Sequence, residues 1–183
     1  MIRIYDSCSI KAIAFVALLV GFAFPLTSSA APAYAAIVGP SGPVTGDVQI
    51  AGREGTIEVE DYTHNVSTPY QASGESPGPG YDLQHRPVRL VMQVSQASPT
   101  LFGFWNDGSV LPSVTIEFWK MIDAVQVNYS TVVLNNAKVV GIIPHKAEST
   151  DDMLETVSFI YESITVSDGQ NAAVSVTSNW DQE

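Results

Sequence analysis

The chain has 183 residues, with 8 lysine and arginine residues against 19 aspartate and glutamate residues and a formal net charge of −11. This charge argues against nucleic acid and against an anionic membrane as partners, because both attract basic surfaces. The one cysteine, Cys8, lies near the amino terminus. The rest of the chain therefore depends on core burial rather than disulfides, which a single domain of about 150 residues can manage.

Residues 1–30 have the features of a secretory signal peptide. Basic side chains precede an apolar run over residues 12–24, and small residues follow it. That run is shorter than the roughly 20 residues that a membrane-spanning helix needs. We therefore expect a cleaved signal, with cleavage after Ala30 or after Ala35, no stable membrane insertion after cleavage, and a secreted or periplasmic location in a bacterium.

The next segments alternate between turn-rich and strand-like sequence. Residues 31–46 are rich in glycine and proline, which predicts a linker or an extended arm. Alternating apolar residues predict strands over 47–51 and 57–60. Residues 70–82 combine glycine, proline and polar residues and predict a mobile loop. We assign a β-barrel domain to residues 47–183.

A short helix is predicted between two strands, over residues 88–94 and 113–120. Ser98 suits the capping position, because its hydroxyl can bind the free N–H groups of the first turn. Pro99 suits the first helical position, where its missing N–H costs nothing. Gly108 follows polar residues that end the helix.

The predicted helix has an uneven distribution of aromatic side chains. Leu101, Phe104 and Trp105 share one face, which we expect to pack on the core, while Phe102 points away from it. The helix is therefore expected to depend on packing rather than on intrinsic propensity.

The last part of the chain is again strand-like. Apolar residues alternate over 125–133, over 156–166 with a phase change near Glu162, and over 172–180. Asn135-Asn136 fits either a two-residue turn or a bulge in one long strand, and both readings stay open. Seven or eight strands and one helix predict a mainly β protein: a small antiparallel β barrel or sandwich with one short flanking α-helix.

The sequence contains no credible catalytic constellation. Ser76 lies in a G-x-S-x-G pattern, but Pro77 follows it and lacks the N–H that such an elbow uses to bind an oxyanion. His64, His85 and His145 are scattered in the sequence and are expected on the surface or in loops. We therefore expect no enzyme activity, no cofactor and no metal site.

Four sequence pieces follow one another in a characteristic order after a strand. They are residues 98–101 (SPTL), 114–119 (VTIEFW), 134–140 (LNNAKVV) and 154–164 (LETVSFIYESI). In this order and spacing the chain resembles the tube proteins of type VI secretion systems, the hemolysin-coregulated protein (Hcp) family. No single piece is diagnostic, and the likeness is weaker toward the amino terminus.

The resemblance implies a structural, non-enzymatic protein that assembles with itself into a hexameric ring. Rings of that family stack into a tube that is propelled by a contractile sheath. The tube carries a spike protein at its end and can carry effectors in its lumen. One feature departs from the family pattern, because tube proteins that leave through their own machine need no signal peptide. The alternative is therefore a secreted monomeric binding module that keeps the fold without a contractile tube.

Some apolar residues are predicted on strand or helix faces opposite the core. Exposed apolar side chains of this kind are what contacts between ring subunits would use. The candidates for a subunit interface are Phe102, Trp119, Val132 and Ile160.

Overall fold

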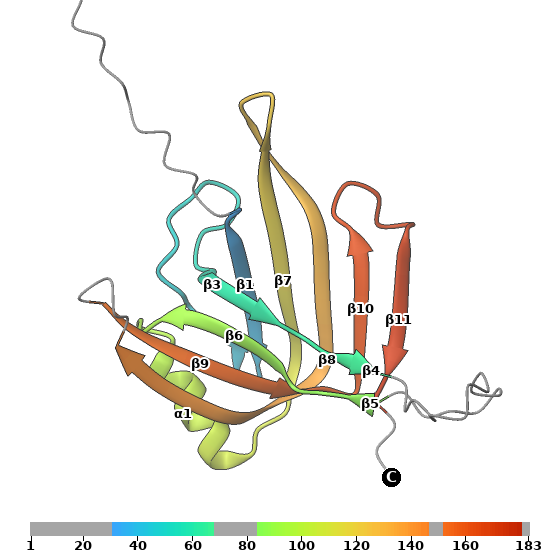
Figure 1. The fold of residues 1–183 in the computed structure, drawn as a ribbon. Coiled ribbons are helices and arrows are strands. Elements are labelled where there is room, and N and C mark those ends of the chain that lie inside the picture. Colours follow the sequence, from blue (N-terminus) through green and yellow to red (C-terminus); the bar gives the residue numbers. More distant parts are fainter. Residues whose placement is uncertain (1–30, 68–83, 147–151, 181–183) are drawn as a thin grey trace, which may run out of the picture.

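The computed structural model describes residues 31–67, 84–146 and 152–180, which form eleven strands and one helix (Figure 1). The expected signal peptide (1–30) and mobile loop (70–82) lie outside the described residues. The elements are β1 (Ala33–Gly39), β2 (Gly42–Pro43), β3 (Ile57–Thr63), β4 (Val66–Ser67), β5 (Gln84–His85), β6 (Val88–Gln93), α1 (Ser98–Asp107), β7 (Leu111–Ile122), β8 (Val125–Lys146), β9 (Met153–Ile160), β10 (Ser163–Asp168) and β11 (Ser175–Asn179).

Six of the strands close into a barrel. The hydrogen-bonded order runs β7-β1-β3-β6-β9-β8, and β8 pairs with β7 again, so the circuit is complete. All of these pairs are antiparallel. The β10–β11 hairpin extends the sheet from the outer edge of β8 and projects beside the barrel (Figure 1). The predicted mainly β fold with one short helix is confirmed.

Alternating side chains of the barrel strands fill its interior. Val88, Leu90 and Met92 of β6 have no exposed surface, and neither do Val157 and Phe159 of β9. Because successive residues of a strand point to opposite sides, this alternation in the sequence was sufficient to predict the inner face of β6. The core is a single cluster to which all six barrel strands contribute.

The long strand β8 belongs both to the barrel and to the projecting sheet. Its residues 130–135 pair with β10, and its residues 138–146 pair with β9. Asn136 lies between these two sets with a φ of 48°, a conformation that asparagine tolerates better than most residues. The one-strand reading of Asn135-Asn136 is confirmed, and the two-residue turn is wrong.

The predicted strand over residues 156–166 is divided into β9 and β10. Tyr161 and Glu162 separate them, and the Glu162 N–H donates to the carbonyl oxygen of Asn135 at 3.0 Å. The phase change in the sequence therefore marks the point where the chain leaves the barrel for the projecting sheet.

The prediction of a linker or arm over residues 31–46 is wrong. β1 lies between β3 and β7, and its side chains Tyr34 and Ile37 are 3% and 1% exposed. Alanines dominate the strand, so its alternation is weak in the sequence. Most of the glycine and proline that suggested a linker forms the tight β1–β2 connection over residues 39–43, where Gly42 has a φ of 124°.

The strand predicted over residues 47–51 is also wrong, because these residues belong to a loop between β2 and β3. Backbone hydrogen bonds close the loop on itself: the Gly46 N–H donates to the Gly55 carbonyl oxygen, and the Gly55 N–H donates to that of Val48. The buried valine anchors the loop to the barrel without a strand of its own.

The position of β1 separates the two candidate cleavage sites. Cleavage after Ala35 would remove the first three residues of β1, including the buried Tyr34, and with them the pairing of β1 to β3. We expect cleavage after Ala30, so that the mature protein begins at Ala31. Intact mass spectrometry of the exported protein would measure this, and a mature protein beginning at Ala36 would contradict it.

The helix α1 packs against β8 and is anchored by one fully buried side chain, Leu101. Ser98 does not cap it as predicted: Ala97 occupies the N-cap without a side-chain hydrogen bond, and the Ser98 hydroxyl donates to the buried Glu155 carboxylate at 2.7 Å. Gly108 ends the helix in a left-handed conformation, as expected. Within the described residues, no helix is long and apolar enough to cross a bilayer.

Candidate assembly surfaces

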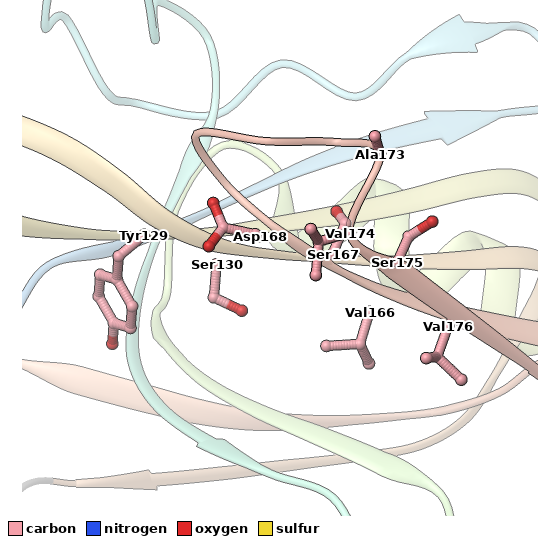
Figure 2. A pocket seen from close by; sticks show the side chains of 9 residues that line it. All are labelled: Tyr129, Ser130, Val166, Ser167, Asp168, Ala173, Val174, Ser175 and Val176. Atoms are coloured by element: carbon pink, nitrogen blue, oxygen red, sulfur yellow. The ribbon is translucent and has the colours of Figure 1, made fainter.

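An apolar groove lies along the β10–β11 hairpin where it projects beyond the barrel (Figure 2). The groove has a volume of about 580 Å³. Figure 2 shows the side chains of Val166 and Val176 next to each other on the same side of the hairpin. The residues of this hairpin groove are Tyr129, Ser130, Val166, Ser167, Asp168, Ala173, Val174, Ser175 and Val176.

The hairpin groove is a continuation of the core-facing side of the sheet. Val132 is buried in the core, and its cross-strand neighbour Val166 is 46% exposed. The next strand places Val176 opposite Val166, and Val176 is 73% exposed. Because the barrel ends before β11, no strand of the described part of the chain covers these valines. The apolar face therefore extends past the part of the molecule that can bury it.

The opposite face of the same hairpin is polar. The hydroxyl groups of Thr165 and Thr177, a cross-strand pair, lie 2.8 Å apart. The two faces of the hairpin thus differ in chemistry, although both lie outside the barrel. Only the groove side carries a set of exposed valines among the described residues.

A second apolar surface lies at the end of the β7–β8 hairpin, which extends well beyond the barrel (Figure 1). Asp123 and Ala124 both have positive φ, the geometry of a two-residue turn of type I′. Around them, Met121 and Val125 are 60% and 61% exposed. We call Met121, Ile122 and Val125 the hairpin tip. It is an apolar end on a chain that is otherwise strongly acidic.

A third surface is an aromatic pair on α1. Phe102 and Trp105 are 55% and 44% exposed, and their ring centroids lie 5.3 Å apart. We call these two residues the helix patch. The exposure predicted for Phe102 is confirmed, whereas the core position predicted for Trp105 is wrong. Phe104 packs instead over Gly39, where a side chain would collide with its ring.

Trp119 is half-buried because a side chain of the same molecule covers it. The Arg53 guanidinium lies 4.0 Å from the centre of the Trp119 ring and donates to Gln126 Oε1 at 2.6 Å. The Trp119 indole N–H donates to the Glu117 carboxylate at 3.2 Å. Sequence reasoning missed Arg53, because nothing local marks a loop residue 66 positions before its aromatic partner in the chain.

The two remaining interface candidates, Val132 and Ile160, differ in burial. Val132 is 3% exposed and lies in the core, so its predicted exposure is wrong. The pairing of β7 with β8 shifts between Phe118 and Trp119, so that Tyr129 is an extra residue in β8. After this bulge, the β8 side chains point to the side of the sheet opposite to the predicted one. Ile160 is half-buried at the end of β9 and stays a candidate.

A cluster that the sequence did not predict joins two of the histidines. His64 Nε2 and His85 Nδ1 lie 2.6 and 2.8 Å from the hydroxyl of Tyr161. His85 Nε2 lies 3.0 Å from the Ser178 hydroxyl, and the Trp180 ring stacks on His85 at 5.9 Å. His85 is buried at the end of β5, so the expectation of a surface or loop position is wrong for it, whereas His64 lies in the loop that follows β3, as expected.

Burial affects the protonation of His64 and Tyr161. Burial, and then the neighbouring His85, lower the pKa of His64 below its ordinary value of 6.5. Burial also raises the pKa of Tyr161. Tyr161 is therefore a neutral hydroxyl at physiological pH, and it can both donate and accept a hydrogen bond.

These features define a class of protein: a small antiparallel β barrel with one flanking helix and a projecting apolar extension of its sheet. A family model described as "Type VI secretion system effector, Hcp" matches residues 34–167. The "Major exported protein" of Pseudomonas aeruginosa is 30% identical over 154 residues, which cover 74% of this chain and 88% of that protein.

Solved structures agree with the sequence comparison. The Hcp1 protein of E. coli EAEC 042 superposes with a TM-score of 0.72 at 27% identity, covering 82% of this chain and 100% of that one. The secreted protein Hcp3 of Pseudomonas aeruginosa gives a TM-score of 0.69 at 26% identity, covering 84% and 100%. The chain belongs to the Hcp family of type VI secretion system proteins.

Proposed function

We propose that the protein is an exported structural subunit that assembles with itself into a hexameric ring of the secretion-tube type. The observation that carries the proposal is the hairpin groove, an apolar face that continues out of the core and that the monomer leaves exposed. Large exposed apolar faces are unusual on monomeric proteins and mark interaction sites. The role is mechanical and requires no catalytic group.

The location of the apolar surfaces supports a ring rather than a two-fold dimer. The helix α1, which carries the helix patch, and the β10–β11 hairpin, which carries the hairpin groove, lie on different sides of the molecule (Figure 1). When two unlike surfaces of one subunit meet in successive copies, the contact is head-to-tail, and it closes into a ring if the rotation permits. Stacked rings would use the hairpin tip, and a sheath, a spike protein or effectors would be the further partners.

The test of this proposal is the mass and shape of the mature protein. Size-exclusion chromatography with light scattering is expected to give a hexamer, and negative-stain microscopy is expected to show rings with an open lumen. A strictly monomeric protein at micromolar concentrations would overturn the proposal. It would favour the alternative, a secreted monomeric binding module. The hairpin groove has a size suited to a small ligand and would then be the binding site.

The Phe102→Asp variant tests whether Phe102 contributes to assembly rather than to folding. The side chain is more than half exposed, so the free energy of unfolding should change by less than about 1 kcal/mol. A carboxylate in a subunit contact must lose its water without gaining a partner, so assembly should weaken at least about tenfold. Chemical denaturation and light scattering measure the two effects.

Thr100→Asp is the matched control for this variant, since it adds the same charge to an exposed position of α1 outside the helix patch. It should leave assembly unchanged. Equal losses of stability and assembly in the Phe102 variant would show instead that Phe102 supports the fold.

A further inference from the structure

A pocket lined by two arginines lies where β3 ends and β6 begins. It has a volume of about 380 Å³, and its lining residues are Thr63, Asn65, Arg86, Pro87 and Arg89. The two sides of the pocket are joined by the cross-strand pair of Thr63 with Arg89. The Arg86 N–H also donates to the Asn65 carbonyl oxygen at 2.9 Å. We call these five residues the arginine pocket.

The arginine pocket is a local concentration of positive charge on an acidic chain. Of the 8 basic residues, Arg3 and Lys11 belong to the expected signal peptide, so the pocket holds two of the remaining six. None of its lining residues is acidic. Within the described part of the chain, neither the Arg86 nor the Arg89 guanidinium is paired with a carboxylate. Because a guanidinium binds a carboxylate through two parallel hydrogen bonds, the pocket suits an anionic partner.

The complementary charge lies at the opposite end of the molecule. Figure 1 shows β5 and the link from β5 to β6 at one end, and the turn of the β7–β8 hairpin at the other. Asp123 lies in that turn, at the centre of the hairpin tip, and is exposed. Asp168, near the turn of the β10–β11 hairpin, instead accepts hydrogen bonds from the Gln170 and Asn171 N–H groups at 2.8 and 3.0 Å. The carboxylate of the hairpin tip has no such bond among the described residues.

The β7–β8 hairpin is held in place before any partner binds. The Arg53 guanidinium, from the loop between β2 and β3, lies over the Trp119 ring and donates to Gln126 Oε1 at 2.6 Å. The Lys120 ammonium lies 4.9 Å from the centre of the Tyr129 ring. Both cations of the hairpin region are therefore placed on aromatic rings of its stem. A surface that is fixed in advance loses less conformational entropy on binding.

We propose that the arginine pocket receives the hairpin tip of a second copy of this chain, with the Asp123 carboxylate between the Arg86 and Arg89 guanidinium groups. The apolar side chains of the tip would pack on Pro87 and on Val66 of β4, which is 42% exposed. This inference rests on the proposed function, in which the hairpin tip connects stacked rings. Because the two surfaces lie at opposite ends of the chain, the contact is head-to-tail and repeats without closing.

The charges of the two surfaces also determine the direction of stacking. Every copy has the same strong negative net charge, so copies repel one another at a distance. A contact between tip and pocket brings opposite charges together. A contact between two tips would bring carboxylates together, and a contact between two pockets would bring guanidinium groups together. Like-charge contacts of this kind suppress the wrong arrangement, so successive copies should all point the same way.

Disulfide cross-linking tests the contact directly, because the one cysteine, Cys8, lies in the expected signal peptide. The mature protein would carry Ala124→Cys in the hairpin turn and Asn65→Cys in the pocket, so that Asp123 and both arginines are retained. A disulfide requires Cα atoms within about 7 Å. The two positions lie at opposite ends of one molecule, so a bond between them joins two copies (Figure 1). Oxidation should give a ladder of linked chains on a denaturing gel.

A matched pair of cysteines controls for random collision. Ala124→Cys combined with Thr100→Cys places the second thiol on an exposed position of α1, away from the pocket. Without a contact to hold the thiols together, this pair should link at least about tenfold more slowly.

Charge variants in the first cysteine pair test the role of the carboxylate. Asp123→Asn suits the same turn but removes the charge, and the combined variant Arg86→Gln/Arg89→Gln removes the charges of the pocket. Each should lower the rate of linking at least about fivefold. All three substitutions together should lower it by no more than the larger of these two losses, because the groups act on each other. Lys138→Gln, an exposed position of β8 outside the pocket, should stay within about twofold.

The outcomes separate this contact from the ring. Equal linking of the two cysteine pairs, or losses from the tip and the pocket that multiply, would overturn the contact. Light scattering of the same samples under reducing conditions measures the ring. Hexamers that do not link from tip to pocket would leave the ring intact and refute the contact. A chain that is monomeric in light scattering but still forms the ladder would refute the ring and support the contact.

Discussion

Phe159→Ala is expected to lower the free energy of unfolding by about 3–5 kcal/mol. Phe159 has no exposed surface, and its strand β9 pairs with β6 on one side and β8 on the other. The strand therefore closes the barrel. The neighbouring strands cannot move in to fill a cavity at this position without breaking their backbone hydrogen bonds to β9. Since a domain is typically stable by about 5–15 kcal/mol, the variant should be close to unfolding. Urea denaturation measures the loss.

Ile160→Ala is the matched control, because it is adjacent in β9 and half-buried on the opposite side of the strand. Its loss of stability should be smaller than that of the Phe159 variant by at least about 1.5 kcal/mol. Similar losses at the two positions would mean that the two sides of β9 are equally packed, contrary to the burial pattern. Ile160→Ala also tests whether this residue contributes to assembly, by light scattering at equal concentration.

Val176→Asp should have the largest effect on assembly, with an affinity about a hundredfold lower. In the proposed ring the carboxylate would be buried against an apolar surface of the next subunit. In the monomer, Val176 is 73% exposed and contributes mainly through its cross-strand partner Val166, so unfolding should change by less than about 1 kcal/mol. Light scattering over a concentration series measures the affinity.

Thr177→Asp adds the same charge to the next residue of β11, on the polar face of the hairpin. It should assemble within about threefold of the unaltered protein, since an exposed charge on a polar surface changes little. If both variants dissociate equally, the added charge is responsible and the groove is not the contact. If Val176→Asp assembles normally, the groove is not part of the ring.

The strands with regular alternation could be predicted from the sequence. β6 was predicted from Val88, Leu90 and Met92, and α1 from its proline and glycine limits, because these signals are local. β1 was missed because its sequence, AYAAIVG, is apolar almost throughout and therefore lacks the apolar–polar alternation that marks a strand. Its position in the sheet depends on pairing with β3 and β7, which no local pattern records.

The candidate surfaces were less predictable for two physical reasons. A single bulge at Tyr129 reverses which residues of β8 face inward, and this placed Val132 on the wrong side in the prediction. The Arg53–Trp119 stack and the contact of His64 with Tyr161 join residues that are 66 and 97 positions apart. Contacts of that separation come from the closure of the barrel, and spacing in the sequence gives no sign of them.

The continuous strand β8 would have a mechanical consequence in the proposed secretion tube. Its backbone runs without a break from the barrel into the projecting sheet, and it pairs with β7 along most of its length. A force on the β10–β11 hairpin is therefore carried into the barrel by covalent bonds and by a long row of hydrogen bonds loaded together. The barrel and the projecting sheet should consequently bear thrust as one rigid body, without a hinge between them.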